Sequence, residues 1–291
     1  MSEALEILLD ILNLEQTDVN VFKGKSPNDR RKRVFGGQLA SQGLMAAGKT
    51  VTSGKIRSLH SYFLRPGDVN KPIYFHVDTV KTKPTDSVRK VTARQDGEDI
   101  FTLVSLFHDD ETVISNHHQM PHVPCPDELP TLDEQLSPWS GKFGDWNYRL
   151  RPFDQRYIDP PHFQICDHPT SSRLRIWMIA DGNLPDNPLL HACTFTYASD
   201  STLLDSVLLP HRLSTINSKV NFASLEHSIW FHREIKADAW FLCDQDSPVA
   251  YGGVALARDR TFNAEGCLLA TVNQEILVRI PDSSELESVA N

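Results

Sequence analysis

The chain has 291 residues, of which 40% are hydrophobic, so it is long enough for one large domain or two smaller domains with a buried core. Its 29 Lys and Arg against 38 Asp and Glu residues give a net charge of −9, which excludes a general nucleic-acid-binding protein with a basic face. No apolar run approaches the length of a membrane span, so we expect no stable membrane insertion. The chain shows no signal-peptide pattern, no S-K-L-type peroxisomal address, and five cysteines without C-x-x-C spacing. These features predict a cytoplasmic protein with reduced thiols.

Two helical patterns and four strand patterns occupy the first 120 residues. Leucines at i, i+3, i+4 and i+7 predict an amphipathic helix over 2–14, with Ser2 as its N-cap. After a basic loop, small residues predict a second helix over 34–50 that lies close to a neighbour. Turn signals then separate strand-like runs at 58–64, 72–80, 87–95 and 99–108.

The middle of the chain, from about residue 117 to 188, is rich in proline, aromatic and charged residues and is interpreted as a connector. The first pattern then returns. "TYASDSTLLDSVLL" predicts a helix over 196–209, with Asp200 as a cap at its start. Strands are predicted at 220–232, 240–246, 250–262 and 267–280, with a hairpin turn at 263–266.

The two halves echo each other. "LHSYF" at 59–63 resembles "EHSIWF" at 226–231, which offsets His60 from His227 by 167 residues, and the turn glycines Gly97 and Gly266 are offset by 169. A repeated helix and antiparallel meander predict an α+β double hot dog, in which two antiparallel sheets each wrap a central helix. The alternative is a single mixed α+β domain with a chance echo.

The predicted units are an N-terminal hot dog at 1–120, a connector at 121–190, a C-terminal hot dog with the catalytic residues at 191–282, and a disordered tail at 283–291.

Five segments carry a specific resemblance. In chain order they are "RVFGGQLASQGLMAA", "LHSYFLRPGD", "YASDSTLL", "LEHSIWFHR" and "ATVNQE". Together they resemble the type II acyl-CoA thioesterase family, whose members are double hot dogs that hydrolyse fatty acyl-CoA to free acid and CoA. The resemblance implies a medium- to long-chain acyl-CoA substrate, no cofactor, and a homo-oligomer, either a dimer or a tetramer.

The resemblance also implies a catalytic set of Asp200, Ser224 and Gln274. A carboxylate can accept a proton from water, while a hydroxyl and an amide can hold that water in line with the thioester carbonyl. Taken singly, each residue is better explained by a structural role, as a cap, a strand hydroxyl or a loop contact, than by catalysis. The repeat offsets map Ser224 to Arg57 and Gln274 to Ser105, and place Asp200 near "FGGQ", so we expect one active site, in the second half.

Substrate contacts are predicted at residues that suit phosphates or a close backbone approach. They are Gly36, Gly37, Arg65, Arg89 and Arg233. The basic run at 30–33 is a further candidate, although such a run is equally a solvated loop. The histidines and cysteine of "NHHQMPHVPCP" lack a regular zinc pattern, so we expect no metal site.

Two alternatives stay open. One is a hot-dog dehydratase or hydratase, which needs a histidine beside its acid; we interpret His227 as structural because His60 repeats it in the half without a catalytic set. The other is a protein that binds acyl-CoA without hydrolysing it, for which the full Asp/Ser/Gln set is unnecessary.

Overall fold

The computed structural model describes residues 1–83, 85–109, 114, 116–139, 149–160, 171–213 and 220–279. Within these residues, twelve strands form one antiparallel sheet in the order β1-β2-β4-β5-β6-β3-β9-β12-β11-β10-β8-β7. The strands of the first half are β1 (Glu15–Asp18), β2 (Val21–Gly24), β3 (Lys55–Phe63), β4 (Ile73–Thr82), β5 (Asp86–Gln95) and β6 (Glu98–His108). Those of the second half are β7 (Phe153–Tyr157), β8 (Leu174–Ala180), β9 (Asn221–Phe231), β10 (Phe241–Tyr251), β11 (Val254–Asn263) and β12 (Leu268–Arg279).

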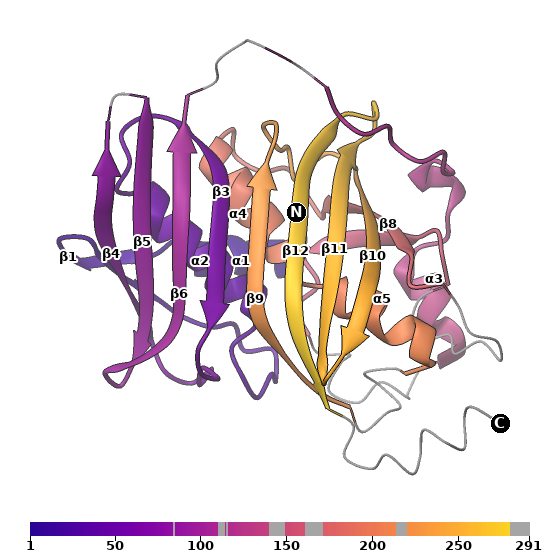
Figure 1. Ribbon diagram of the computed structural model, residues 1–291, viewed down its shortest axis with the longest axis horizontal. Helices are drawn as coiled ribbons and strands as arrows, with labels where there is room; N and C mark the ends of the chain where they lie inside the picture. The colour runs from indigo at the N-terminus through magenta and orange to yellow at the C-terminus, as the bar shows by residue number, and fades with distance from the viewer. Residues whose placement is uncertain are drawn as a thin grey trace.

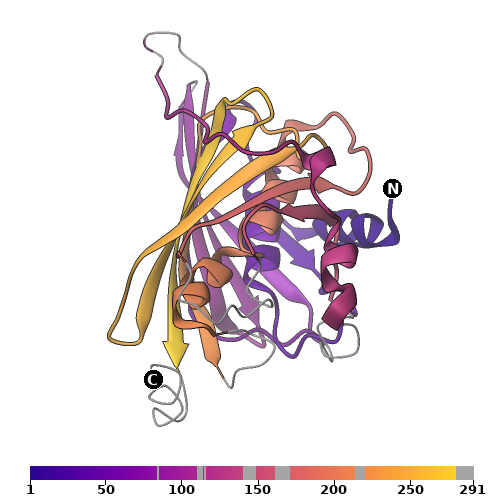
Figure 2. The same cartoon turned by 90° about the vertical axis from the view of Figure 1, so that its right-hand side faces the viewer.

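The helices lie on one face of this sheet (Figures 1 and 2). They are α1 (Glu3–Leu12), α2 (Gly36–Gly48), α3 (Leu132–Leu136), α4 (Pro188–Ser199) and α5 (Leu203–Leu208), with short 3-10 turns at Pro126–Glu128, Ser137–Trp139 and Leu209–His211. The central helices α2 and α4 pack against each other, and nearly all their residues are buried. Each half of the sheet curls around one of them, which confirms the double hot dog. Buried side chains from both halves form one continuous core.

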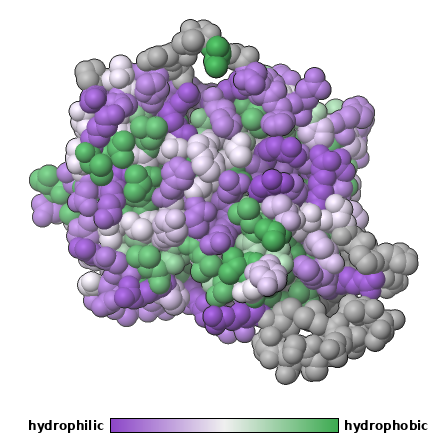
Figure 3. Space-filling view, viewed as in Figure 1, coloured by the Kyte–Doolittle hydropathy of each residue, from purple (hydrophilic) through white to green (hydrophobic). Residues whose placement is uncertain are grey.

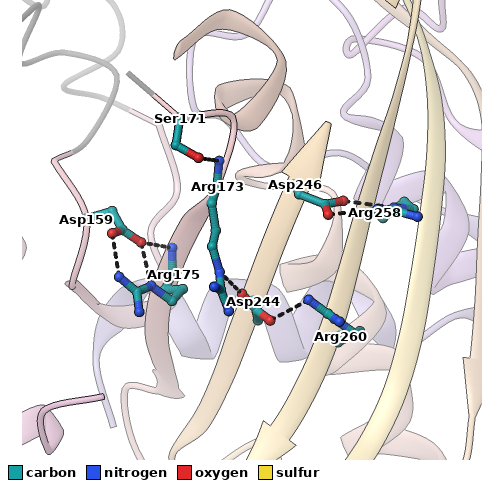
Figure 4. A network of polar contacts seen from close by, with 8 residues as sticks. All are labelled: Asp159, Ser171, Arg173, Arg175, Asp244, Asp246, Arg258 and Arg260. Carbon is teal, nitrogen blue, oxygen red and sulfur yellow. Dashed lines mark hydrogen bonds and ion pairs between the residues drawn. The ribbon is translucent and has the colours of Figure 1, made fainter. Parts of the chain in front are cut away.

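The opposite face of the sheet is mainly polar (Figure 3). Charged side chains bridge β10 to β11 and to the residue before β8 (Figure 4). The carboxylate of Asp244 accepts from Arg173 Nε and Arg260 Nη2, both at 2.8 Å, and Asp246 accepts from Arg258 at 2.7 and 2.8 Å. At the end of the sheet a small apolar cluster around Trp177 is covered by the segment near Pro124, whose carbonyl accepts from the indole at 3.0 Å.

The structure joins the predicted two sheets into one. Strands β3 and β9 pair antiparallel at the junction of the halves, with Leu59 opposite Ile229. Edge-to-edge pairing satisfies the backbone groups that two separate sheets would leave exposed at these edges.

Equivalent backbone hydrogen bonds in the two halves also correct the repeat offset. Leu64 and Arg65 both donate their backbone N–H to Ile100 O, and His232 and Arg233 do the same to Leu269 O. These equivalent contacts give an offset of 168 after β3 and β9, not the 167 read from the His-Ser echo. A one-residue shift in a strand moves every side chain to the other face, so His60 and His227 are not equivalent.

Most predicted elements are confirmed, with four differences. Residues 15–24 form β1 and β2, which the polar sequence did not predict. The connector contributes β7 and β8, which continue the sheet beyond β10. Gly252 and Gly253, both at positive φ, form a tight turn that divides the predicted strand at 250–262 from β10. The helix predicted at 196–209 is wrong in its start, because α4 begins at Pro188 and ends at Ser199, before α5.

The first helix and its Ser2 cap are confirmed, since Ser2 Oγ accepts from Leu5 N at 3.2 Å. The tail at 283–291 lies outside the described residues, and the predicted domain boundaries stay a prediction. No helix among the described residues is long and apolar enough to cross a membrane.

Candidate active site

Asp200 lies at the end of a central helix, not at the start of the next one. It is the C-cap residue of α4, and Thr202 is the N-cap residue of α5. Its carboxylate nevertheless caps a helix start, because Oδ2 accepts from Gly37 N at 2.7 Å in the first turn of α2, 163 residues away. The prediction named the wrong helix, because Asp200 caps the start of α2 and not the helix that follows it. The predicted kind of interaction is confirmed, since the positive end of the α2 dipole faces the carboxylate.

Gln274 connects the three residues of the predicted catalytic set. Its Nε2 donates to Asp200 Oδ1 at 2.7 Å and to Ser224 Oγ at 2.8 Å. Gln274 is buried in β12, whereas Asp200 and Ser224 are partly exposed. The structure thus brings the carboxylate, the hydroxyl and the amide together, with the two partly exposed oxygens on either side of one nitrogen.

A β-bulge turns Ser224 toward the helices. Along β9, His227 pairs with Gln274 and Glu226 with Glu275, but Ser224 pairs with Ile276, so Leu225 is the extra residue. Regular alternation from His227 would place Ser224 on the outer face, and the bulge returns it to the side of Gln274 and the buried Ile276.

Burial raises the pKa of the Asp200 carboxyl above its usual value of 3.8. The hydrogen bonds from Gln274 and Gly37 and the positive charge of Arg31 act in the opposite direction but do not cancel this effect. A partly desolvated carboxylate is a stronger base than one in water.

His227 completes a buried chain of hydrogen bonds behind the site. Its Nδ1 lies 2.8 Å from Gln274 Oε1, and its Nε2 lies 2.9 Å from Ser199 Oγ at the end of α4. Burial lowers the pKa of the imidazole below its usual 6.5. His60 instead lies on the outer face, with its Nδ1 2.9 Å from Ser228 Oγ and its ring 5.0 Å from that of Trp230.

Among the described residues of the first half, the positions equivalent to the predicted catalytic set carry other residue types. With the corrected offset of 168, Ser224 corresponds to Ile56 rather than Arg57. Gln274 corresponds to Ser105 as predicted, because Ser105 lies opposite Leu59 as Gln274 lies opposite His227. The "FGGQ" segment is not the counterpart of Asp200 but its neighbour. The C-cap residue of α2, which corresponds to Asp200 at the end of α4, is Lys49.

The paired glycines at the start of α2 lie directly against the carboxylate. A Cβ added to Gly36 would lie 2.6 Å from Asp200 Oδ2, and one added to Gly37 would lie 2.6 Å from the carbonyl oxygen of Tyr197. Glycine is needed at both positions, because the backbone of Gly36 lies this close to the Asp200 side chain and the backbone of Gly37 lies this close to the Tyr197 carbonyl. Their predicted role in substrate contact stays a prediction, but their place beside Asp200 is a fact of the fold.

The predicted arginines have different surroundings. Arg89 is 4% exposed, and its guanidinium donates to the carbonyls of Thr50, Lys81 and Val88, which contradicts its predicted role in binding substrate phosphate. Arg65 is exposed, donates to Asp99 O at 2.7 Å and pairs with Glu98.

Arg233 is not brought to the site. It follows the end of β9 opposite to Ser224, and nine extended residues span about 30 Å. Its Nη1 donates to Leu268 O at 2.8 Å. From the basic run at 30–33, Arg31 does lie beside the site: its guanidinium lies 4.3 Å above the ring of Phe35, the residue before Gly36, and its Nε pairs with Asp29 at 2.9 Å.

The residues that the sequence did not predict as neighbours of the set are His227, Ser199 and Phe63, which would meet a Cβ on Gly36 at 3.1 Å. The sequence echo between His60 and His227 predicts a structural role for both, but the register of β3 and β9 places the two side chains on opposite faces of the sheet. A one-residue correction of the offset would have placed His227 on the helix-facing side of the strand, opposite Gln274.

The fold and this geometry define a double hot dog with one Asp/Ser/Gln site. A hot-dog-fold protein of unknown function from Alicyclobacillus acidocaldarius superposes with a TM-score of 0.78 over 97% of this chain and 100% of its own, at 20% identity, which supports the fold alone.

Models of known families give the more specific result. Residues 25–108 match the acyl-CoA thioesterase N-terminal domain and residues 165–277 match acyl-CoA thioesterase. Mouse acyl-coenzyme A thioesterase 8 is 33% identical over 96% of this chain and 91% of its own length. The structure of acyl-CoA thioesterase II TesB2 from Mycobacterium marinum is 35% identical, with a TM-score of 0.77 over 95% of this chain and 98% of that one. The chain belongs to the type II acyl-CoA thioesterase family.

Proposed function

We propose that this protein hydrolyses the thioester bond of medium- to long-chain fatty acyl-CoA, with Asp200 as the general base for an attacking water. The reaction class, hydrolysis of acyl-CoA, follows from membership of the family. The observation that carries the assignment of residues is the double donation from Gln274 Nε2 to Asp200 Oδ1 and Ser224 Oγ, at 2.7 and 2.8 Å.

In this mechanism a water molecule lies between the Asp200 carboxylate and the Ser224 hydroxyl. Asp200 takes a proton from the water as its oxygen bonds to the thioester carbonyl carbon. The tetrahedral intermediate then collapses, the carbon–sulfur bond breaks, and the CoA thiolate takes the proton back from Asp200. The products are the free fatty acid and CoA, and the atoms and protons of these steps balance without a cofactor.

Gln274 supplies orientation in this mechanism. Because both of its amide hydrogens are used, on Asp200 and Ser224, the acceptor oxygens of the site are held in one arrangement before substrate binds. Ser224 Oγ accepts the bond from Gln274, so its own hydrogen is free to bond water or the substrate carbonyl.

The dehydratase alternative is not favoured by the geometry. Gln274 separates His227 from Asp200, and both ring nitrogens of His227 are engaged, by Gln274 and Ser199. A fully buried imidazole in that position has no free nitrogen for a substrate proton.

The test is release of free thiol from a series of acyl-CoA esters with increasing chain length, followed with a thiol-reactive dye. The proposal predicts turnover that rises toward medium and long chains. Tight binding of the same esters without thiol release would instead support the non-catalytic binding protein. The cytoplasmic location and the homo-oligomer remain predictions, which fractionation and light scattering of the full chain would test.

A further inference from the structure

The hydrogen bonds around Gln274 can be assigned a direction, atom by atom. Nε2 faces two acceptors, the Asp200 carboxylate and Ser224 Oγ, so it is the amide nitrogen that lies on that side. Oε1 therefore faces His227 Nδ1 at 2.8 Å. An amide oxygen only accepts, so Nδ1 must carry the hydrogen.

The opposite orientation of this amide would disable the site. A half-turn would place Oε1 against the Asp200 carboxylate at about the same distance, where two acceptors repel. Ser224 would have to donate to Oε1, and its hydroxyl hydrogen would no longer be available to water. Which way the amide lies thus decides whether Asp200 and Ser224 face the substrate as base and donor.

His227 is held so that it can select that orientation. The imidazole is fully buried, and burial lowers its pKa, so it is neutral and carries one ring hydrogen. Its other nitrogen, Nε2, then accepts from the hydroxyl of Ser199, 2.9 Å away. The Ser199 hydroxyl has a single hydrogen and can also donate it to Thr196 O, at 2.9 Å within α4, so in this tautomer His227 Nε2 takes the hydrogen in place of that carbonyl. The ring is anchored on the residue that precedes Asp200.

We propose that His227 is a positioning residue for the hydrolysis: as the Nδ1–H tautomer it holds the Gln274 amide with Nε2 toward Asp200 and Ser224. The chain Ser199–His227–Gln274 then links the end of α4 to β12 and sets the donors and acceptors of the site. The inference rests on the proposed function, since positioning has meaning only for a site that reacts.

Three substitutions separate this role from packing. His227→Asn keeps a donor where Nδ1 lies, His227→Gln keeps a polar group only where Nε2 lies, and His227→Phe keeps the ring volume with neither. We expect His227→Asn to retain most of kcat, and His227→Gln and His227→Phe to lose about 10²-fold, with KM little changed. His60→Phe, on the outer face of the neighbouring strand, is the matched control and should keep the kcat of the parent protein.

Two further measurements distinguish positioning from packing, and the second is made on the parent protein. In the Gln274→Ala background, His227→Phe should cause no additional loss, because His227 acts through Gln274. In protein labelled with 15N-histidine, long-range NMR correlations should show His227 protonated at Nδ1 and not at Nε2 at neutral pH, with His227→Phe used to assign the signals.

Several results would overturn the inference. They are equal kcat values for all three His227 variants, losses that multiply in the double variant, or an Nε2–H tautomer. Absence of thiol release from the parent protein with every acyl-CoA would contradict the proposed function instead. The tautomer measurement would still report on the geometry of the hydrogen bonds in that case.

Discussion

Substitution of Gly36 by alanine tests how tightly the fold positions the Asp200 carboxylate. The added methyl carbon would lie 2.6 Å from Asp200 Oδ2, whereas ordinary contact begins at 3.4 Å. The carboxylate would have to retreat by about 0.8 Å, and the added methyl carbon would also meet the ring of Phe63 at 3.1 Å. Gly37 N and Gln274 Nε2 each donate to the carboxylate at 2.7 Å. Because these donors belong to the fixed backbone and to a buried side chain, a displaced carboxylate would lose this hydrogen-bond geometry.

Misplacement of a reacting group by about 1 Å costs on the order of 10²-fold in rate, which corresponds to about 2.7 kcal/mol in the barrier. We therefore expect Gly36→Ala to lower kcat by about 10²-fold. The assay is steady-state thiol release from one long-chain acyl-CoA, with circular dichroism to confirm the fold.

Gly43→Ala is the matched control, because it lies in the same helix and its Cβ would contact only side chains of β6, the nearest at 3.2 Å. It should affect stability more than kcat. If Gly36→Ala keeps the kcat of the parent protein while folding normally, then the carboxylate of Asp200 does not need its observed position, and the assignment of the base is wrong.

Three other predictions follow from the same structure. Because burial raises the pKa of Asp200 above 3.8 and the ionised form is the base, kcat/KM should fall as the pH drops through a value higher than 3.8, in a pH–rate profile; a flat profile down to pH 4 would contradict it. Ser224→Ala removes one hydrogen-bond partner of Gln274, whereas Gln274→Ala removes a partner from each of Asp200, Ser224 and His227, so Ser224→Ala should reduce kcat less. Ser224→Thr, which keeps the hydroxyl, should retain the kcat of the parent protein. Asp244→Ala should lower the free energy of unfolding by about 1–3 kcal/mol in urea titrations, since it removes a buried carboxylate between two arginines (Figure 4). The more exposed Asp246→Ala should cost under about 1 kcal/mol.

Much of the fold could be predicted from the sequence because its signals are local. Alternation and turn residues predicted β3 to β6 and β9 to β12 to within a few residues, and the repeat predicted the double hot dog. The missed strands β1 and β2 are short, and β1 is fully exposed, so they carry no buried alternation. The tight turn at Gly252 was not predicted, because the strands on both sides of it show similar strand-like sequence patterns.

The contacts within the candidate site could not be predicted from local sequence patterns. Motifs predicted which side chains belong to it, but Asp200 contacts Gly37 across 163 residues, and no local pattern encodes that contact. The bulge at Leu225 reverses the alternation that a sequence argument assumes for Ser224. The burial of Arg89 could not be predicted locally, because its guanidinium donates to the carbonyl of Thr50, 39 residues away, as well as to nearby carbonyls.

The central claim is that Asp200 is the base of a thioesterase site. Asn at position 200 is isosteric but cannot accept from both Gly37 N and Gln274 Nε2, since one of its two terminal atoms is a donor. The most direct measurement is thiol release from a long-chain acyl-CoA by Asp200→Asn beside the parent protein, with thermal unfolding of both. The account predicts that the parent protein turns over and that the folded variant loses about 10²- to 10⁴-fold in kcat, as expected when a general base is removed. A folded Asp200→Asn variant with the kcat of the parent protein would contradict it.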